Sequence, residues 1–294
     1  MSSDPLPTTH HPRMFADAER YLDLARQGRN EWWRYLIGAA IIAFFWLVLG
    51  NVPYVLLVLA GWSDPPFDFI AINISIFMML AGLAVTVKLI HRRSLRSLIT
   101  PEVRIDWARI ARAAAVWVVL SAAVAILEHL LYPERYYLSF NRERFFVYFV
   151  LVLVLTPLQC FVEELVFRGY LMQALGLLTR RALAIAVVSS IAFTIPHLLN
   201  PEVLEHGAAI MAANYFTIGM LLATVTLRDG RLELAIGLHA VNNVFLALVA
   251  NYEGSVLATE SVFTARELDP VYSLVTLIAG AVAFHWWIFR RARE

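Results

Sequence analysis

The sequence has little of what soluble or disulfide-bonded proteins are built from. Only 16% of its 294 residues are charged, 60% are hydrophobic, and Cys160 is the single cysteine. A lone cysteine excludes an intramolecular disulfide framework, and so apolar a composition excludes an ordinary soluble domain. The formal net charge of +1 gives no indication of a nucleic-acid partner. The composition therefore indicates a membrane protein, with the lipid bilayer as its surroundings.

Several sequence signatures of hydrolytic sites are also missing. The chain contains no His-Glu-x-x-His, no Gly-x-Ser-x-Gly and no Gly-x-Gly-Asp motif. Those motifs mark zinc-dependent, serine-dependent and aspartate-dependent proteases. Any chemistry in this chain must therefore rest on another arrangement of residues.

What the sequence does contain is a series of long apolar runs. They fall near residues 34–60, 67–90, 107–132, 146–176, 182–199, 208–227, 232–251 and 271–289. A helix rises about 1.5 Å per residue, so runs of this kind can cross a hydrocarbon core of about 30 Å. We predict an all-α fold, a polytopic membrane bundle of about eight transmembrane helices.

The positive residues are divided unevenly between the segments that join these runs. Of the 24 Lys and Arg residues, 19 flank the N-terminus, the C-terminus and every second loop, while only four lie in the alternate loops. Cytoplasmic flanks retain positive residues that resist translocation. We therefore predict that both termini are cytoplasmic, which requires an even number of spans, and that the protein lies in a prokaryotic inner (cell) membrane.

The runs also suggest how the chain is organised. We expect a polar cytosolic tail over residues 1–31, with a short amphipathic helix from Met14 to Arg26, then three transmembrane helices over residues 32–144. Residues 145–252 form a core of four helices, and residues 253–294 supply an external loop, the eighth helix and a basic C-terminus. No internal repeat or second domain is evident.

Three charged residues interrupt the fourth apolar run: Glu163, Glu164 and Arg168. A charge at the centre of a membrane helix costs about 2.5 to 3.5 kcal/mol on insertion, so such residues mark functional sites by default. Glu164 and Arg168 are four residues apart and should form an ion pair on one helical face. Glu163 is turned about 100° away from Glu164 and is left to face another group.

Two further polar pairs lie in later runs. Phe193 and His197 are in the fifth run, and His239 and Asn243 lie one helical turn apart in the seventh. Counting residues from the cytoplasmic edges places Glu163, both histidines and Asn243 near the bilayer midplane. We therefore expect one shared cavity.

These residue types suit peptide-bond hydrolysis. A desolvated carboxylate beside a neutral imidazole can deprotonate water, and an imidazole N–H with a carboxamide can stabilise an oxyanion. Glu163, His197 and His239 could equally hold Zn²⁺, which activates water itself. The residues alone do not separate these two mechanisms.

The chain resembles the CAAX-protease and bacteriocin-processing family of intramembrane proteases, also called Abi or CPBP, which includes the type II CAAX prenyl endopeptidases. The resemblance rests on Glu163-Glu164-x-x-x-Arg168, Phe193-x-x-x-His197 and His239-x-x-x-Asn243, in this order on separate runs. It covers about a third of the chain. It implies that Glu163 and His197 activate a water, that His239 and Asn243 stabilise the oxyanion, and that the substrate is a membrane-associated peptide or protein.

Two other functions fit the same residues. The first is a non-catalytic membrane scaffold or immunity protein that retains the pocket. In the protease itself we expect Glu164, Arg168 and Phe193 to support the site. The second is a proton-coupled transporter with Glu163 as its relay, which is weaker because many transporters show an internal repeat. We interpret Cys160, Asn214 and Asn242 as packing residues or as polar links between helices.

Overall fold

The computed structural model describes residues 16–62, 65–257 and 259–290. Within these ranges, six helical runs are long and apolar enough to cross a membrane: Trp32–Leu59, Pro65–Ile90, Trp107–Leu131, Arg142–Leu178, Ala208–Asp229 and Pro270–Phe289. Two shorter apolar helices, α8 (Ala182–His197) and α11 (Glu233–Leu248), match the fifth and seventh predicted runs. The predicted all-α polytopic fold is confirmed, whereas the count of eight crossings stays a prediction.

Several of these runs are built from more than one helical segment. The first comprises α2 (Trp32–Ala43), a π-helix (Phe44–Val48), a 3-10 turn (Leu49–Asn51) and α3 (Val52–Leu59), and the second comprises α4 (Pro65–Val85) and a π-helix (Thr86–Ile90). The fourth comprises α6 (Arg142–Glu164), the π-helix η8 (Leu165–Leu171) and α7 (Met172–Leu178). The other long helices are α5 (Trp107–Leu131), α10 (Ala208–Asp229) and α12 (Pro270–Phe289).

Side-chain caps fix where three of the long helices begin. Asp106 accepts hydrogen bonds from two backbone N–H groups at the start of α5, Asn141 accepts one at the start of α6, and Asp269 accepts two at the start of α12. Each cap satisfies backbone donors that have no partner inside the helix. These polar caps lie just outside the apolar stretches, so each of the three preceding loops ends close to where a predicted span begins.

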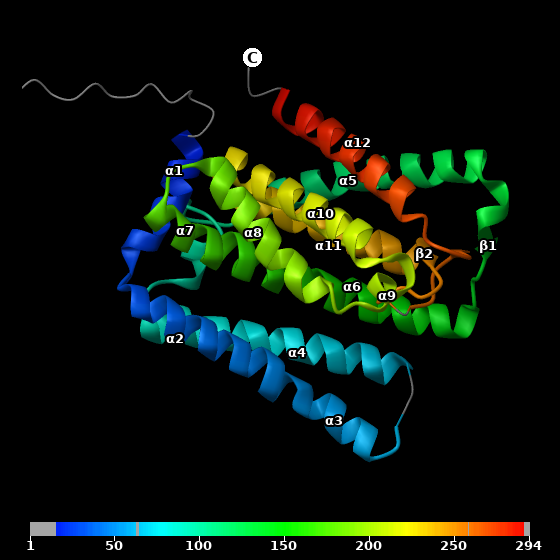
Figure 1. Ribbon diagram of the computed structural model, residues 1–294, viewed down its shortest axis with the longest axis horizontal. Coiled ribbons are helices and arrows are strands. Elements are labelled where there is room, and N and C mark those ends of the chain that lie inside the picture. The colour runs from blue at the N-terminus through cyan, green and yellow to red at the C-terminus, as the bar shows by residue number, and fades with distance from the viewer. Residues whose placement is uncertain (1–15, 63–64, 258, 291–294) are drawn as a thin grey trace, which may run out of the picture.

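The helices pack into a bundle around α10 and α11 (Figure 1). Helix α11 packs against α5 and α6, and α10 packs against α8 and α12. Helix α4 lies along α6, and α2 lies along α4. Helices α2, α3 and α4 form the group at the lower edge of Figure 1. The outer faces carry exposed apolar residues such as Leu59, Leu130 and Val150, whereas Glu164 and Arg168 are buried. This distribution suits a bundle surrounded by lipid.

Contacts between loops divide them into two groups, one at each end of the bundle. At one end, the Leu232 amide donates to the Ile99 carbonyl, the Arg29 amide donates to the His91 carbonyl, and Arg180 pairs with Asp23. At this end the Arg112 guanidinium also donates to the Ile288 carbonyl, near the close of α12. Segments adjoining both termini therefore lie at the same end, which agrees with an even number of crossings.

The opposite end carries a small three-stranded sheet. Strands β1 (Tyr136–Leu138) and β3 (Phe263–Ala265) pair antiparallel, and β2 (Ala250–Tyr252) pairs with β3 in parallel. The sheet joins the loop before α6 to the long loop before α12. Helix α9 (Pro201–His206) lies at the same end, where the Tyr252 hydroxyl donates to Glu202. Which face of the membrane each end occupies stays a prediction.

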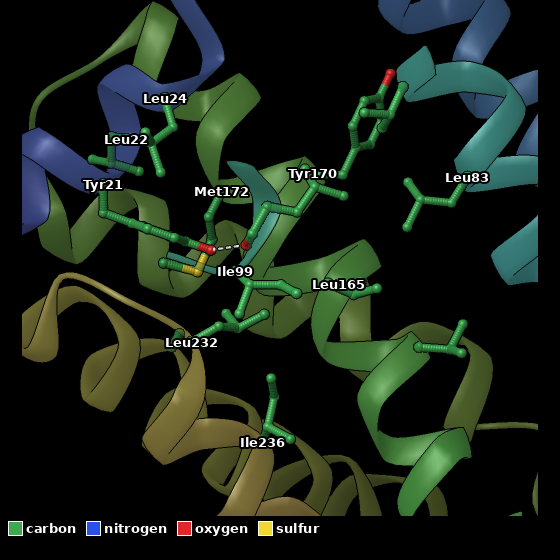
Figure 2. Packing of buried hydrophobic residues seen from close by; sticks show 14 of the residues in the cluster. Tyr21, Leu22, Leu24, Leu83, Ile99, Leu165, Tyr170, Met172, Leu232 and Ile236 are labelled. Atoms are coloured by element: carbon green, nitrogen blue, oxygen red, sulfur yellow. Dashed lines mark hydrogen bonds between the residues drawn. The ribbon is translucent and has the colours of Figure 1, made fainter. Parts of the chain in front are cut away.

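The N-terminal segment is folded onto the bundle. Helix α1 (Ala16–Leu22) continues into a 3-10 helix (Asp23–Gln27), close to the predicted amphipathic helix, although Met14 and the rest of residues 1–15 lie outside the described residues. Tyr21 is fully buried, and its hydroxyl donates to the Leu98 carbonyl at 2.6 Å. Figure 2 shows its ring pointing into a cluster with Met172 and Leu232. The described part of the predicted tail is therefore packed against the core.

Candidate active site

A cavity of about 520 Å³ lies between α4, α5, α6, α8, α10 and α11. Its lining includes the four residues predicted to act in catalysis, which are Glu163, His197, His239 and Asn243. Phe193 also lines the cavity, whereas Glu164 and Arg168 are fully buried behind it. Helices that are distant in sequence thus bring the predicted residues into one space, as the shared-cavity prediction requires.

Glu164 is the centre of a buried network of hydrogen bonds. Its Oε1 lies 2.9 Å from Nη1 of Arg168 and 2.8 Å from Nδ1 of His239. The second guanidinium nitrogen of Arg168 donates to the Gly219 carbonyl at 3.2 Å. The predicted pairing of Glu164 with Arg168 is therefore confirmed. The bond from Glu164 to His239 was not predicted, because it joins helices whose relative placement the sequence does not give.

Glu163 faces the cavity in different surroundings. Its side chain is 8% exposed, and its Oε1 accepts a hydrogen bond from Nε2 of Gln159 at 3.2 Å. Its Oε2 lies 3.8 Å from Nε2 of His239. The imidazole nearest to Glu163 by these contacts is therefore that of His239, while His197 shares the cavity with Glu163. Helical facing separated the two carboxylates correctly but could not identify which imidazole Glu163 would meet.

Phe193 orients His197 through both its backbone and its ring. Nδ1 of His197 lies 2.7 Å from the Phe193 carbonyl oxygen, which can only accept a hydrogen bond, so Nδ1 carries the hydrogen. In a neutral ring, Nε2 is then left as an acceptor. The Phe193 ring lies 4.3 Å from the His197 ring and 5.9 Å from the His239 ring, measured between centroids. The Arg168 guanidinium lies 4.3 Å from the same aromatic ring.

Asn243 is oriented by a chain of hydrogen bonds that the sequence did not predict. Nε1 of Trp117 donates to Oδ1 of Asn242 at 3.0 Å, and Nδ2 of Asn242 donates to Oδ1 of Asn243 at 3.0 Å. An indole N–H can only donate, so this chain fixes the direction of both amides. The donor Nδ2 of Asn243 is left for another partner. Asn242 therefore links α5 to α11, as one of its two predicted roles requires, and it also orients Asn243. Its position beside Asn243 was the signal available in the sequence for this second contact.

The residues do not form a ready metal site. Across the parts of the chain that the structure describes, no group of three or more His, Cys, Asp or Glu side chains is placed to hold a metal ion. Nδ1 of His197 is engaged by the Phe193 carbonyl, and Nδ1 of His239 is engaged by Glu164. Glu163, His197 and His239, the set considered for Zn²⁺, are therefore not gathered as a ligand cluster among the described residues, although each imidazole keeps its Nε2 for another partner.

Comparisons with known proteins give the same family as the motifs. The family model described as type II CAAX prenyl endopeptidase Rce1-like matches residues 142–245. The chain is 30% identical over 275 residues to an uncharacterized protein of Bacillus subtilis named YyaK, covering 88% of this chain and 91% of that protein. No solved structure matches the chain. The matched family segment contains α6, η8, α7, α8 and α10 and extends to Phe245 in α11, so it includes all seven predicted site residues.

Proposed function

Because the chain belongs to the CAAX-protease (CPBP) family, we propose that it is an intramembrane endopeptidase that hydrolyses a peptide bond of a membrane-associated peptide or protein. The observation that carries this proposal is the placement of Glu163, His197, His239 and Asn243 around one cavity inside an apolar bundle. A carboxylate, two imidazoles and a carboxamide can supply a base and hydrogen-bond donors for acyl transfer to water.

In the proposed mechanism, Glu163 accepts a proton from water, and Nε2 of His197 accepts a hydrogen bond from the same water. The attack of that water on the substrate carbonyl places negative charge on its oxygen, toward which Nδ2 of Asn243 can donate. His239, as an imidazolium, donates from Nε2 toward the same oxygen while its Nδ1 donates to Glu164. The tetrahedral intermediate then collapses, the C–N bond breaks, and Glu163 passes the proton that it took from water to the leaving amine. The mechanism as we propose it routes no step through a metal ion.

The proposed substrate is delivered from the membrane. A prenylated C-terminal tail of the CAAX type and a leader peptide are both compatible with a cavity that is buried in an apolar bundle. We place the protein in a prokaryotic inner membrane with both termini cytoplasmic, on the basis of the distribution of Arg and Lys residues and the position of both terminal segments at one end.

The alternative is a non-catalytic scaffold or immunity protein that retains the pocket. The buried Glu164, Arg168 and His239 network would serve either role, because it joins α6, η8 and α11 whether or not water is activated. Glu163 distinguishes the two, since a carboxylate facing a cavity has little structural purpose in a scaffold.

The proposal is tested in cells that carry wild type, Glu163→Gln or Glu143→Gln. Glu143 is exposed in the first turn of the same helix and serves as the matched control. Mass spectrometry of the membrane fraction should find a peptide whose cleavage occurs with wild type and Glu143→Gln and is lost with Glu163→Gln. Identical peptide profiles in all three strains would favour the scaffold.

A further inference from the structure

The cavity that holds the site is acidic along its length. Among the described residues that line it, five carry carboxylates and none is Lys or Arg: Glu128, Glu163, Glu202, Glu267 and Asp269. Glu128 and Asp269 are both paired with Arg135, at 2.7 Å and 3.1 Å. Glu202 and Glu267 have no ion pair in the part of the chain that the structure describes, so the cavity keeps an excess of negative charge.

Glu202 is the most deeply placed of these unpaired carboxylates. Its residue is 2% exposed, and its Oε1 accepts hydrogen bonds from the Tyr215 hydroxyl at 2.6 Å and the Tyr252 hydroxyl at 3.2 Å. Its Oε2 is buried without a partner among the described residues. A buried carboxylate held only by neutral donors is costly unless a cation completes it.

The position of Glu202 connects it to the candidate active site. Tyr215, whose hydroxyl donates to Glu202, has its ring centroid 4.9 Å from that of His197. Asn214, beside Tyr215 on α10, also lines the cavity, and its Oδ1 is a second buried acceptor without a partner among the described residues. Its Nδ2 donates to the Ile210 and Pro270 carbonyls, which fixes the amide with its oxygen as the unused atom. The unused buried atoms on this cavity are thus hydrogen-bond acceptors.

We propose that Glu202 is the acceptor of a cation-binding subsite in this cavity, which takes an ammonium or guanidinium group carried by the peptide substrate. The inference rests on the proposed function, since it names a feature of the substrate that the same site would take. An ammonium or guanidinium supplies donors and charge together, and charge-assisted hydrogen bonds are stronger than neutral ones. Such a group can come from a Lys or Arg side chain or from a peptide N-terminus.

The test measures binding of peptide probes to the Glu163→Gln protein in nanodiscs of zwitterionic phosphatidylcholine, so that neither cleavage nor lipid charge contributes. The probes are Ala-Leu peptides with a fluorophore and a C-terminal alkyl anchor. One series is N-acetylated with a single Lys moved along the chain, one has norleucine in place of Lys, and one is the norleucine peptide with a free N-terminal amine. We expect at least one cationic probe to bind about tenfold more tightly than its norleucine counterpart.

The arm that binds more tightly identifies the source of the cation, and equal affinity of all three series would overturn the proposal. In a Glu202→Gln background the preference should disappear, while Glu205→Gln, a 56% exposed carboxylate on the same helix, should retain it. Should Glu202→Gln not fold, Glu202→Asp keeps the charge and should show a reduced preference. A preference unchanged by either variant of Glu202 would also overturn the assignment.

The binding test does not depend on turnover, so it can be interpreted separately from the test of proteolysis. Preference for a cationic probe without cleavage by wild type would support the subsite and contradict the proposed protease function. Cleavage by wild type without such a preference would support the protease function and contradict the subsite.

Discussion

Two adjacent carboxylates of this chain occupy different environments. Glu164 is fully buried between a guanidinium and an imidazole, whereas Glu163 contacts Gln159 and faces the cavity. Removing the charge of Glu164 would leave the Arg168 guanidinium without a carboxylate, while removing that of Glu163 leaves no buried cation unpaired. We therefore propose a supporting role for Glu164 and a chemical role for Glu163.

Glu164→Gln should destabilise the protein. Breaking a buried pair by removing one partner costs about 3 to 5 kcal/mol, so the variant should unfold at a markedly lower temperature or give little folded protein. Glu163→Gln keeps shape and hydrogen-bonding capacity and should unfold near the wild-type temperature. Thermal unfolding of both variants in the same detergent checks this. A stable Glu164→Gln that is nevertheless inactive would show that the two roles are reversed.

Asn242 should act through Asn243. Asn242→Ala removes the bond that holds Oδ1 of Asn243, so the neighbouring amide can turn away from the cavity. A hydrogen bond of this kind is worth about 0.5 to 1.5 kcal/mol, which predicts a loss of roughly 2- to 12-fold in turnover. Trp117→Phe removes the first donor of the same series of hydrogen bonds and should give a similar loss of turnover. Full turnover in both variants would show that the orientation of Asn243 does not depend on these hydrogen bonds.

At this scale the sequence predicted the contacts within a helix and missed those between helices. Spacing of four residues was enough for Glu164 and Arg168, because backbone geometry places them side by side. Neither the bond from Glu164 to His239 nor the bond from Trp117 to Asn242 follows from spacing, since each joins residues more than 70 positions apart. Their positions depend on how α5, α6 and α11 pack.

Close packing of α11 against α5 brings His239 to its place. A Cβ on Gly237 would collide with the Ile110 carbonyl oxygen, which belongs to the α5 backbone and cannot move aside easily. Gly237 therefore allows the two helices to approach closely, two residues before His239. Gly280 in α12 differs, because a Cβ there would lie 3.5 Å from the Trp117 ring, an ordinary contact distance.

These two glycines give a matched pair of substitutions in membrane helices. Gly237→Ala should destabilise the protein by about 1 to 3 kcal/mol, the usual cost of overpacking, and should also lower activity by displacing α11. Gly280→Ala should leave the unfolding temperature close to that of wild type. Thermal unfolding of the two variants decides the matter, and equal unfolding temperatures would mean that α11 and α5 are less tightly packed than the structure indicates.

The lengths of α8 and α11 show where sequence patterns mislead at the level of an element. The apolar runs at 182–199 and 232–251 continue past the helices, which end at His197 and Leu248. Leu198 and Leu199 belong to the turn before α9, and Ala250 begins strand β2. Apolar character indicates that a residue is kept from water but does not determine whether its backbone is helical. An apolar run alone therefore cannot locate the end of a helix.

For the molecule as a whole, the eight runs and the all-α class could be predicted, because each run corresponds to a helix with ends within a few residues. The three-stranded sheet could not, since its strands are three residues long and β1 pairs with β3 across more than 100 positions. The docking of α1 was also missed, because the amphipathic pattern of Ala18, Tyr21, Leu22 and Leu24 does not identify the surface that their apolar side covers. In both cases tertiary contacts decide the structure of a segment with a weak local signal.

Membrane orientation is the prediction that belongs to the whole chain. Reporter fusions after Arg93, Arg181 and Arg231 should read cytoplasmic, and fusions near Asn141, Glu202 and Glu260 should read external. The reason is that positive residues gather in the first group of loops, which lie together at one end of the bundle. An external signal at Arg181 would contradict the alternation of α7 and α8.

In the proposed reaction Glu163 activates water to cleave a peptide bond within the membrane. Purified wild type and Glu163→Gln, each reconstituted in liposomes, can be incubated with the membrane peptide fraction in H₂¹⁸O and the products analysed by mass spectrometry. Wild type should give a product whose new C-terminal carboxyl carries ¹⁸O, and Glu163→Gln should give no such product. Labelled product formed at equal rates by both proteins, or by neither, would show that Glu163 does not activate the water.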